Sequence, residues 1–158
     1  MLPARAASDR PVFAQLRVSG ELYALAACEL REVLRYRAPT PLPGAPELID
    51  GVVDLRGALI PVVDLARALG RLRPEARPKR IAVVEIRGHV LGLAAQDVLA
   101  VGAIDASQLE APPAVAKPGG EELVCQLIRR SQAEPIPVLS LEALLARIAR
   151  RGPQEVAA

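Results

Sequence analysis

Aromatic residues are almost absent from this chain of 158 residues. They make up 2% of it, as one phenylalanine, two tyrosines and no tryptophan. Its core must therefore be built from aliphatic side chains, and nucleic-acid bases would find almost no aromatic rings on which to stack. The formal net charge of +2 is too weak to predict a polyanionic partner by itself. Both observations count against binding of nucleic acid.

Residue types that perform catalysis or bind metals are also scarce. The chain has one histidine, His89, in an apparent turn, and two cysteines, Cys28 and Cys125, far apart and outside any CxxC pattern. Nucleotide-binding glycine motifs and the GxSxG nucleophile motif do not occur. We therefore expect no enzymatic activity, no cofactor and no metal site. We interpret both cysteines as small buried apolar residues.

Long uncharged apolar segments are missing as well. No segment is long enough to span a bilayer, and the N-terminal "MLPARAASDRP" lacks the apolar core of a signal peptide. Hydrophobic residues nevertheless make up 51% of the chain, which is enough for a folded core. We expect a cytoplasmic protein that does not insert into the membrane.

Short β-branched segments separated by turn residues fill most of the chain. Such a pattern is typical of an all-β fold made of small barrels or of a sandwich. The segments are "FAQLRVS" from Phe13, "LYALAAC" from Leu22, "EVLRYR" from Glu32, "DGVVDL" from Asp50, "ALIPVVD" from Ala58, "RIAVVEI" from Arg80, "VLGLAA" from Val90, "ELVCQLI" from Glu122 and "EPIPVLS" from Glu134.

Two helices are expected. In "DLARALG" an aspartate, Asp64, can cap the first turn and Gly70 can end the helix. In "SLEALLARIARRG" the cap is Ser140, a glutamate follows in the first turn, and arginines precede Gly152. The second segment predicts a C-terminal helix over about 140–151.

Two pairs of similar segments indicate an internal repeat. They occur in the same order in each half, and a proline follows the first isoleucine in both copies of the second pair. The pairs are "LAACELREVL" from Leu25 with "LAAQDVLAV" from Leu93, and "IPVVDLARAL" from Ile60 with "IPVLSLEALL" from Ile136. We interpret the chain as a duplicated β unit, in which Val62 is equivalent to Val138, and Leu65 to Leu141.

Two breaks divide the chain. Residues 71–80, "RLRPEARPKR", are basic and nearly free of apolar side chains, and 110–122, "EAPPAVAKPGGEE", are rich in proline, glycine and charge. Both are interpreted as a linker or a long loop. The expected organisation is one domain over 12–150, with a first subdomain over about 20–72 and a second over about 79–140, followed by the C-terminal helix.

A turn separates the strands "GVVDL" and "ALIPVVD". Gly57 supplies the backbone freedom that a tight turn needs, and Arg56 lies beside it. The arginine is therefore expected at the end of a rigid hairpin, a suitable place for a side chain that recognises a partner. The alternative is an exposed turn arginine that pairs locally with Asp54.

The middle of the chain resembles the CheW family of chemotaxis coupling proteins. The resemblance is specific around "VVDLRGALIPVVDLARALG" and extends from about Phe13 to about Ala146. The matching segments are "YALAACELREVLRY", "PLPGAPELIDGVVDLRGALIPVVDLARALG", "RIAVVEIRGHVLGLAAQDVLAV" and "IPVLSLEALL". It implies two small five-stranded SH3-like barrels around a shared hydrophobic centre.

The same resemblance implies a non-enzymatic adaptor. Such adaptors join the cytoplasmic tip of a methyl-accepting chemoreceptor to the regulatory domain of a CheA-type histidine kinase. The signalling output can be flagellar, twitching or another response. A small β-barrel nucleic-acid-binding protein is the alternative of a different class, and a small enzyme is the third.

Partner-binding residues follow from the resemblance too. It implies that the arginine of "LRG" lies beside the receptor-docking region between the barrels, and that the "ACELREV" segment contributes to it. The implied residues are Arg56, Gly57 and Val52 in the first block, and Ala27, Leu30, Glu32 and Val33 in the second.

The chain departs from the family pattern at several positions. Asp54 replaces the usual asparagine before "LRG", and Gln96 stands at a usual aspartate position of the second barrel. "VCQL" replaces a glycine-containing strand, and Ser140 replaces the aspartate that begins the last helix. Most departures lie in the second barrel, so the first barrel follows the family pattern more closely than the second.

Overall fold

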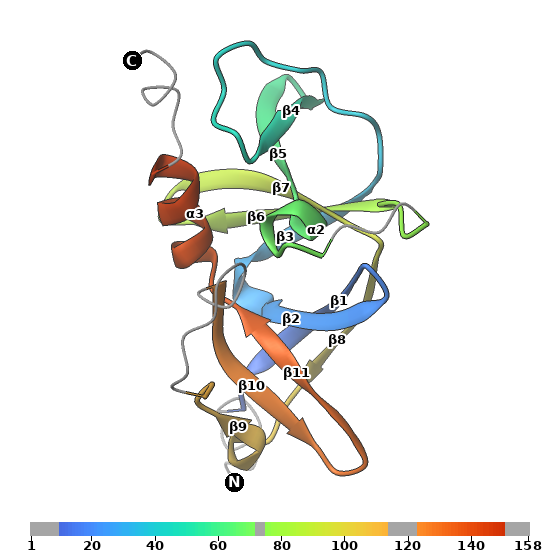
Figure 1. Ribbon diagram of the computed structural model, residues 1–158, viewed down its shortest axis with the longest axis vertical. Helices are drawn as coiled ribbons and strands as arrows, with labels where there is room; N and C mark the ends of the chain where they lie inside the picture. Colours follow the sequence, from blue (N-terminus) through green and yellow to red (C-terminus); the bar gives the residue numbers. More distant parts are fainter. Residues whose placement is uncertain (1–9, 72–74, 114–122, 151–158) are drawn as a thin grey trace, which may run out of the picture.

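The computed structural model describes residues 10–71, 75–113 and 123–150 (Figure 1). The strands are β1 (Val12–Val18), β2 (Glu21–Ala26), β3 (Leu30–Arg35), β4 (Ile49–Leu55), β5 (Ala58–Asp64), β6 (Arg80–Ile86), β7 (His89–Ala95), β8 (Asp97–Ala103), β9 (Leu109–Glu110), β10 (Val124–Arg130) and β11 (Ala133–Leu139). The helices are η1 (Ala27–Glu29), α2 (Leu65–Ala68), η2 (Ala106–Gln108) and α3 (Leu141–Arg150).

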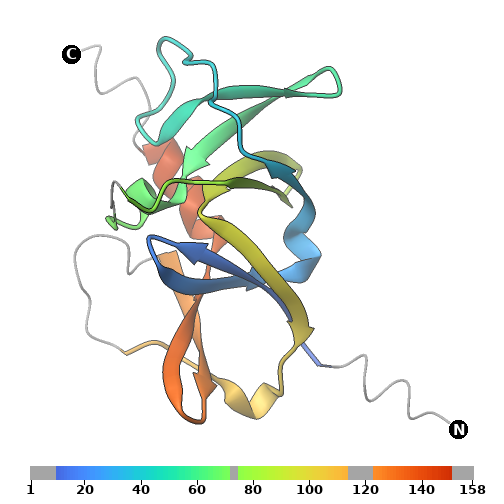
Figure 2. The same cartoon turned by 90° about the vertical axis from the view of Figure 1, so that its right-hand side faces the viewer.

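These strands form two sheets, one above the other in Figures 1 and 2. The upper sheet has five strands in the order β3-β6-β7-β5-β4, and we call it barrel B. The lower sheet has the order β8-β1-β2-β11-β10-β9, and we call it barrel A; its sixth strand, β9, is only two residues long. The predicted all-β fold of two small barrels with few helices is confirmed.

The barrels do not follow the expected division into consecutive subdomains. Strands β6 and β7 come from the second half of the chain, yet they pair with β3, β5 and each other in barrel B. Strands β1 and β2 come from the first half, yet they pair with β8 and β11 in barrel A. The first hairpin of each half therefore belongs to the barrel whose other strands come from the other half. The expected subdomains 20–72 and 79–140 consequently do not correspond to the two barrels.

The internal repeat is visible in the strand registers. In barrel B, Val62 lies opposite Gly92 in the parallel pair of β5 and β7. In barrel A, Val138 lies opposite Ala24 in the parallel pair of β11 and β2. Since Val62 and Val138 occupy matching places beside matching strands, their predicted equivalence is confirmed.

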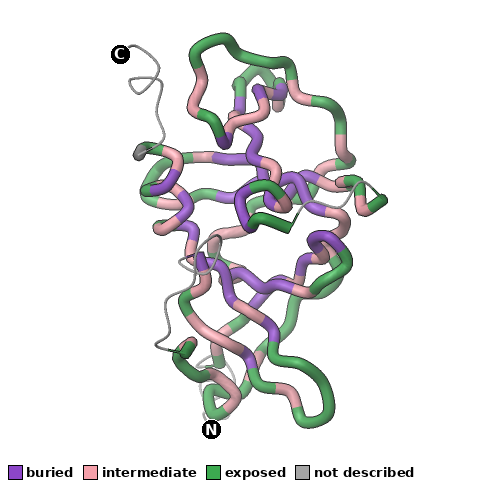
Figure 3. The backbone as a smooth tube through the Cα atoms, in the orientation of Figure 1, coloured by how far each residue is buried: buried purple, intermediate pink, exposed green. Residues whose placement is uncertain are grey.

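Among the described residues, the buried hydrophobic side chains form three clusters, and the largest, the shared core, takes residues from both barrels. Figure 3 shows many buried backbone segments where the two barrels meet. This shared core takes matching residues from both repeats, including the pairs Leu25 and Leu93, Leu65 and Leu141, Ala14 and Ala82. A smaller cluster fills each barrel, around Val62 in barrel B and around Val138 in barrel A. Aliphatic side chains dominate all three, as the scarcity of aromatic residues predicts.

Three hairpins turn through the same backbone conformation. Ser19, Arg56 and Arg87 have φ angles of 51°, 50° and 50°, and a glycine with positive φ follows each. A positive φ at both central positions defines the type I′ turn, whose twist matches that of the flanking strands. The sequence therefore fixes the β1–β2, β4–β5 and β6–β7 hairpins locally.

Both predicted helix caps are present. Asp64 Oδ1 accepts a hydrogen bond from the Ala66 amide at 3.0 Å, and Ser140 Oγ accepts one from the Ala143 amide at 3.1 Å. Arg147 of α3 then donates from Nη1 to the carbonyl oxygen of Ala68, at 2.8 Å. This bond connects the end of α2 to α3, and both helices contribute residues to the shared core.

The expectation that both cysteines are buried is wrong. Cys28 lies in the short helix η1 and Cys125 near the start of β10, and both are free and exposed. A thiol is small enough for either environment, so composition alone did not decide its place. Residues 72–74 and 114–122, within the two predicted linkers, lie outside the described residues.

The exchange of hairpins predicts that neither half of the chain folds alone. Fragments 1–78 and 79–158 would each lack two strands of the sheet that they need, and each would expose half of the shared core. Separately they should show no cooperative thermal unfolding by circular dichroism. An equimolar mixture should recover β structure. A cooperative transition in either fragment alone would contradict the interleaved arrangement.

Leu65 should be essential for stability, because it is 1% exposed and lies in the shared core. Leu65→Ala is expected to lower the free energy of unfolding by roughly 2–5 kcal/mol, measured by urea denaturation. The control is Leu59→Ala in the neighbouring strand, since Leu59 is 69% exposed. That variant should lose less than about 0.5 kcal/mol. Equal losses would show that burial in the shared core is not the cause.

Candidate partner-binding site

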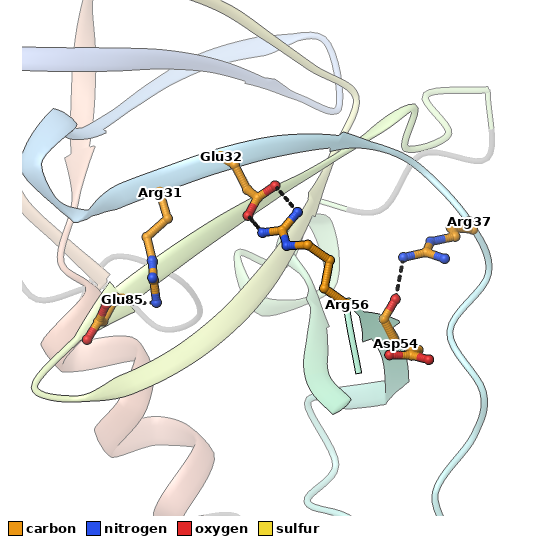
Figure 4. Close-up of polar contacts among 6 residues, drawn as sticks. All are labelled: Arg31, Glu32, Arg37, Asp54, Arg56 and Glu85. Atoms are coloured by element: carbon orange, nitrogen blue, oxygen red, sulfur yellow. Dashed lines mark hydrogen bonds and ion pairs between the residues drawn. The ribbon is translucent and has the colours of Figure 1, made fainter. Parts of the chain in front are cut away.

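Arg56 reaches from its hairpin turn to the edge strand β3 (Figure 4). Its guanidinium contacts both carboxylate oxygens of Glu32: Nη1 lies 3.3 Å from Oε1, and Nη2 forms a close ion pair with Oε2. The paired geometry of guanidinium and carboxylate suits this two-point contact. The sequence-predicted residues Arg56 and Glu32 are therefore brought together, although 24 positions separate them.

This ion pair joins opposite edges of one sheet. In the order β3-β6-β7-β5-β4, Glu32 lies on the first strand and Arg56 follows the last. The contact thus closes the side of barrel B that no strand pairing closes. Both side chains stay accessible, with 71% of the Arg56 side chain and 31% of the Glu32 side chain exposed. A partner can therefore contact the pair without unfolding the barrel.

The ion pair shifts the titration of both groups. The hydrogen bond from Arg56 is the largest cause that lowers the pKa of Glu32, and the charges of Arg56 and Arg31 lower it further. The hydrogen bond to Glu32 in turn raises the pKa of Arg56. Because the Glu32 pKa is lower in the folded state, the pair favours folding above the ordinary glutamate range. That contribution is lost as the pH falls through the lowered pKa.

Asp54 serves the turn and is not the partner of Arg56. Its Oδ1 accepts a hydrogen bond from the Gly57 amide at 2.9 Å. Its backbone carbonyl accepts another from Arg37 Nη2 at 2.6 Å. An asparagine Oδ1 could accept the same Gly57 hydrogen bond, so the departure from the family pattern preserves the turn. The local pairing considered for Arg56 is replaced by the contact with Glu32.

Leu30 and Val33 lie on the other face of β3. Val33 pairs with Ala82, which belongs to the shared core, whereas Glu32 pairs with Val83, which belongs to the interior of barrel B. Paired residues point to the same side of a sheet, and neighbours along a strand to opposite sides. Leu30 and Val33 therefore do not surround Arg56 with apolar contacts, although the resemblance places all three in one partner-binding set; they border the junction between the barrels.

The remaining predicted residues are spread around these two places. Ala27 lies in η1, half-buried, directly before β3. Val52 lies in β4 opposite Pro61 and forms a bridge with Thr40. Its neighbour Val53 points into barrel B, so Val52 lies on the outer face of the hairpin. The structure thus assigns the predicted set to more than one surface.

The repeat adds residues on β8 to the surface at the barrel junction. Val101 pairs with Ala14 as Val33 pairs with Ala82, and Ala14 and Ala82 both belong to the shared core. Val33 is 41% exposed and Val101 is 59% exposed. We call Leu30, Val33, Val98 and Val101 the junction surface. The sequence analysis does not include the β8 residues of this surface. The repeat could have indicated them, because aligning "LAACELREV" with "LAAQDVLAV" makes Val101 the equivalent of Val33.

Within residues 10–71, 75–113 and 123–150, no cluster of three or more His, Cys, Asp or Glu side chains is arranged to bind a metal ion. None of the helices in this part of the chain combines the length and apolar character needed to cross a membrane. The candidate site therefore combines the accessible Arg56–Glu32 ion pair of barrel B with the partly exposed apolar junction surface. Accessible arginine and aliphatic side chains of this kind are typical of proteins that bind other macromolecules.

Comparison with known proteins agrees with this class and gives the family. The model of the family described as "CheW-like domain" matches residues 13–149, which include both barrels and α3. The chain belongs to the CheW-like domain family.

Individual relatives are similar over different lengths. Protein FrzA of Myxococcus xanthus is 32% identical over 149 residues, covering 88% of this chain and 93% of FrzA. The chemotaxis protein CheW of Rhizobium meliloti is 33% identical over 89 residues, covering 54% of this chain and 57% of that protein. The crystal structure of the scaffolding protein TtCheW from Thermoanaerobacter tengcongensis superposes with a TM-score of 0.73 at 30% identity, covering 84% and 85% of the two chains.

Replacing Arg56 should change the titration of Glu32 in a predictable direction. In Arg56→Gln the pKa of Glu32 should rise toward its ordinary value, because its main hydrogen-bond donor and nearest positive charge are lost. Carboxyl ¹³C NMR across an acid titration measures this shift. Asp105 is the internal control, since its lowered pKa depends first on hydrogen bonds from Ser107. An unchanged Glu32 pKa would show that the ion pair is not formed in solution.

Proposed function

We propose that this protein is a non-enzymatic adaptor of a chemosensory signalling array. It couples the cytoplasmic tip of a chemoreceptor to the regulatory domain of a CheA-type histidine kinase. The observation that carries this proposal is the family match over residues 13–149, which covers both barrels. The names of the relatives, a chemotaxis protein and a scaffolding protein, support it. Its location would be cytoplasmic, at receptor arrays in the membrane that it joins through its partners.

The junction surface and the Arg56–Glu32 ion pair suit two different kinds of partner contact. The junction surface is apolar and rests on the shared core, so it suits a receptor segment that buries aliphatic side chains. The Arg56–Glu32 pair lies at the side of barrel B, on the other face of β3, with Gly57 beside it. An accessible arginine on a rigid turn suits a directional contact with either partner.

The nucleic-acid-binding alternative is not favoured. The family match gives it no support, and the chain has few aromatic rings on which bases could stack. Affinity capture from the lysate of the source organism separates the two proposals. A CheA-type kinase or a chemoreceptor should be recovered under the adaptor proposal, and nuclease-sensitive material under the alternative. Recovery of neither partner at physiological salt would reject the adaptor proposal.

Arg56→Glu should weaken binding to the receptor or the kinase. It replaces the cation that would contact the partner and places a second carboxylate beside Glu32. We expect a loss of at least about tenfold in affinity, measured by titration calorimetry with each purified partner, and a nearly unchanged melting temperature.

Arg87→Glu is the matched control for this variant. Arg87 also occupies the first position of a type I′ turn, has the same 71% exposed side chain, and pairs with a glutamate, Glu142. It changes the charge equally at a different hairpin. If both variants bind like the wild type, Arg56 is only a solvated turn residue. If Arg56→Glu lowers the melting temperature instead, its role is structural.

A further inference from the structure

Two arginines face each other at one end of the junction surface. Arg35 is the last residue of β3, and Arg80, the first residue of β6, lies directly opposite it. Like charges in directly opposed positions of a sheet repel each other. Arg35 is exposed and Arg80 half-buried. Among the described residues, neither forms an ion pair with a carboxylate; Arg80 donates only to the backbone carbonyl of Lys79, at 3.0 Å.

Strand alternation places this basic pair next to the apolar residues of β3. Arg35 lies two residues after Val33, and Arg80 two residues before Ala82, so all four side chains point to the same side of the sheet. Two residues of a strand advance the chain by about 7 Å. The Arg35 side chain therefore begins about 7 Å along β3 from that of the exposed Val33.

The repeat shows that the fold itself does not require these arginines. The equivalent positions in barrel A are Ala103 and Val12, which are also opposite each other on β8 and β1. Both are exposed, Val12 by 43%. Equivalent strand positions thus carry two apolar side chains in barrel A and two arginines in barrel B.

We propose that Arg35 and Arg80 form an acceptor for a carboxylate of the receptor segment that binds the junction surface. The occupant is a helical segment with an aliphatic side chain at one position and an aspartate or glutamate one turn further along. Side chains three or four positions apart on a helix lie about 5–6 Å apart, which fits the step from Val33 to Arg35. This inference rests on the proposed function and adds the chemistry by which the partner is selected.

Charge complementarity is the physical basis of the proposal. A carboxylate between two guanidinium groups receives charge-assisted hydrogen bonds from both and removes their mutual repulsion. Binding then relieves an unfavourable contact of the free protein. Lys79 and Arg77, both exposed, lie one and three residues before Arg80 in the chain and add to the positive potential there.

The test uses the full chain and a soluble fragment of the cytoplasmic tip of a chemoreceptor from the source organism. Arg35→Glu should weaken binding of this fragment at least tenfold, and Arg35→Gln by less. The affinity of the wild type should fall more steeply with added salt than that of Arg35→Gln. Arg35→Gln should melt no lower than the wild type, because it removes a repulsion. The control is Arg130→Glu at the far end of barrel A, where the Arg130 side chain donates a hydrogen bond to the backbone carbonyl of Glu134.

A second arm identifies the partner carboxylate. Each acidic residue of the fragment is replaced in turn by its amide, and each variant is titrated with wild-type protein and with Arg35→Gln. One replacement should weaken wild-type binding and have little effect on Arg35→Gln, which shows coupling between the two groups. Additive losses at every acidic position would overturn the inference.

The outcomes distinguish this inference from the proposed function. If Val33→Glu abolishes binding while Arg35→Glu and Arg130→Glu bind like the wild type, the adaptor proposal stands and the carboxylate acceptor is rejected. If the wild-type protein binds neither the receptor fragment nor the kinase, the proposed function fails, and the inference fails with it.

Discussion

The shared core between the barrels is the constraint on which the rest of the structure depends. It takes equivalent residues from both repeats, and the strands that carry them are exchanged, so β1 and β2 complete barrel A while β6 and β7 complete barrel B. Neither barrel can bury its apolar residues without the other half of the chain. The two barrels are consequently held in a fixed relation, and so are the strands β3 and β8 that border their junction. A partner that contacts both strands meets a preformed surface and does not have to order it first.

The repeats preserve their cores and differ at their surfaces. Buried positions match in pairs, such as Val62 with Val138 and Leu65 with Leu141. The accessible positions do not: Glu32 of β3 corresponds to Ala100 of β8, so the Arg56–Glu32 contact has no counterpart on β8. The Arg35–Arg80 pair likewise corresponds to Ala103 and Val12. The two repeats therefore present different surfaces on equivalent frameworks.

Departures from the family pattern keep the local hydrogen bonds. Ser140 caps α3 as an aspartate would, and Asp54 accepts the turn amide that an asparagine would accept. Gln96 also forms a hydrogen bond, in which its Oε1 accepts from the Gly20 amide at 2.8 Å. That contact joins the β1–β2 turn to the segment between β7 and β8. At these three positions the side chains present therefore keep or supply hydrogen bonds that hold the turns and the start of α3.

The sequence by itself determined the local features of this protein. Strand segments, type I′ turns and helix caps depend on residues close together in the chain, whose conformational preferences act over a few positions. The repeat is readable directly from the two pairs of similar segments. The resemblance to a family predicted the two-barrel fold and named Arg56 and Glu32 as parts of one partner-binding site. Only the tertiary structure decided which hairpin completes which barrel, because strands of either repeat offer the same pattern of apolar residues to a partner. It also decided that Leu30 and Val33 face away from Arg56, that both cysteines are exposed, and that Arg35 lies opposite Arg80. The facing of Leu30, Val33 and Arg35 depends on the register of β3 and on its bulge between Leu30 and Glu32, because a shift of a single residue would reverse the face of every side chain that follows.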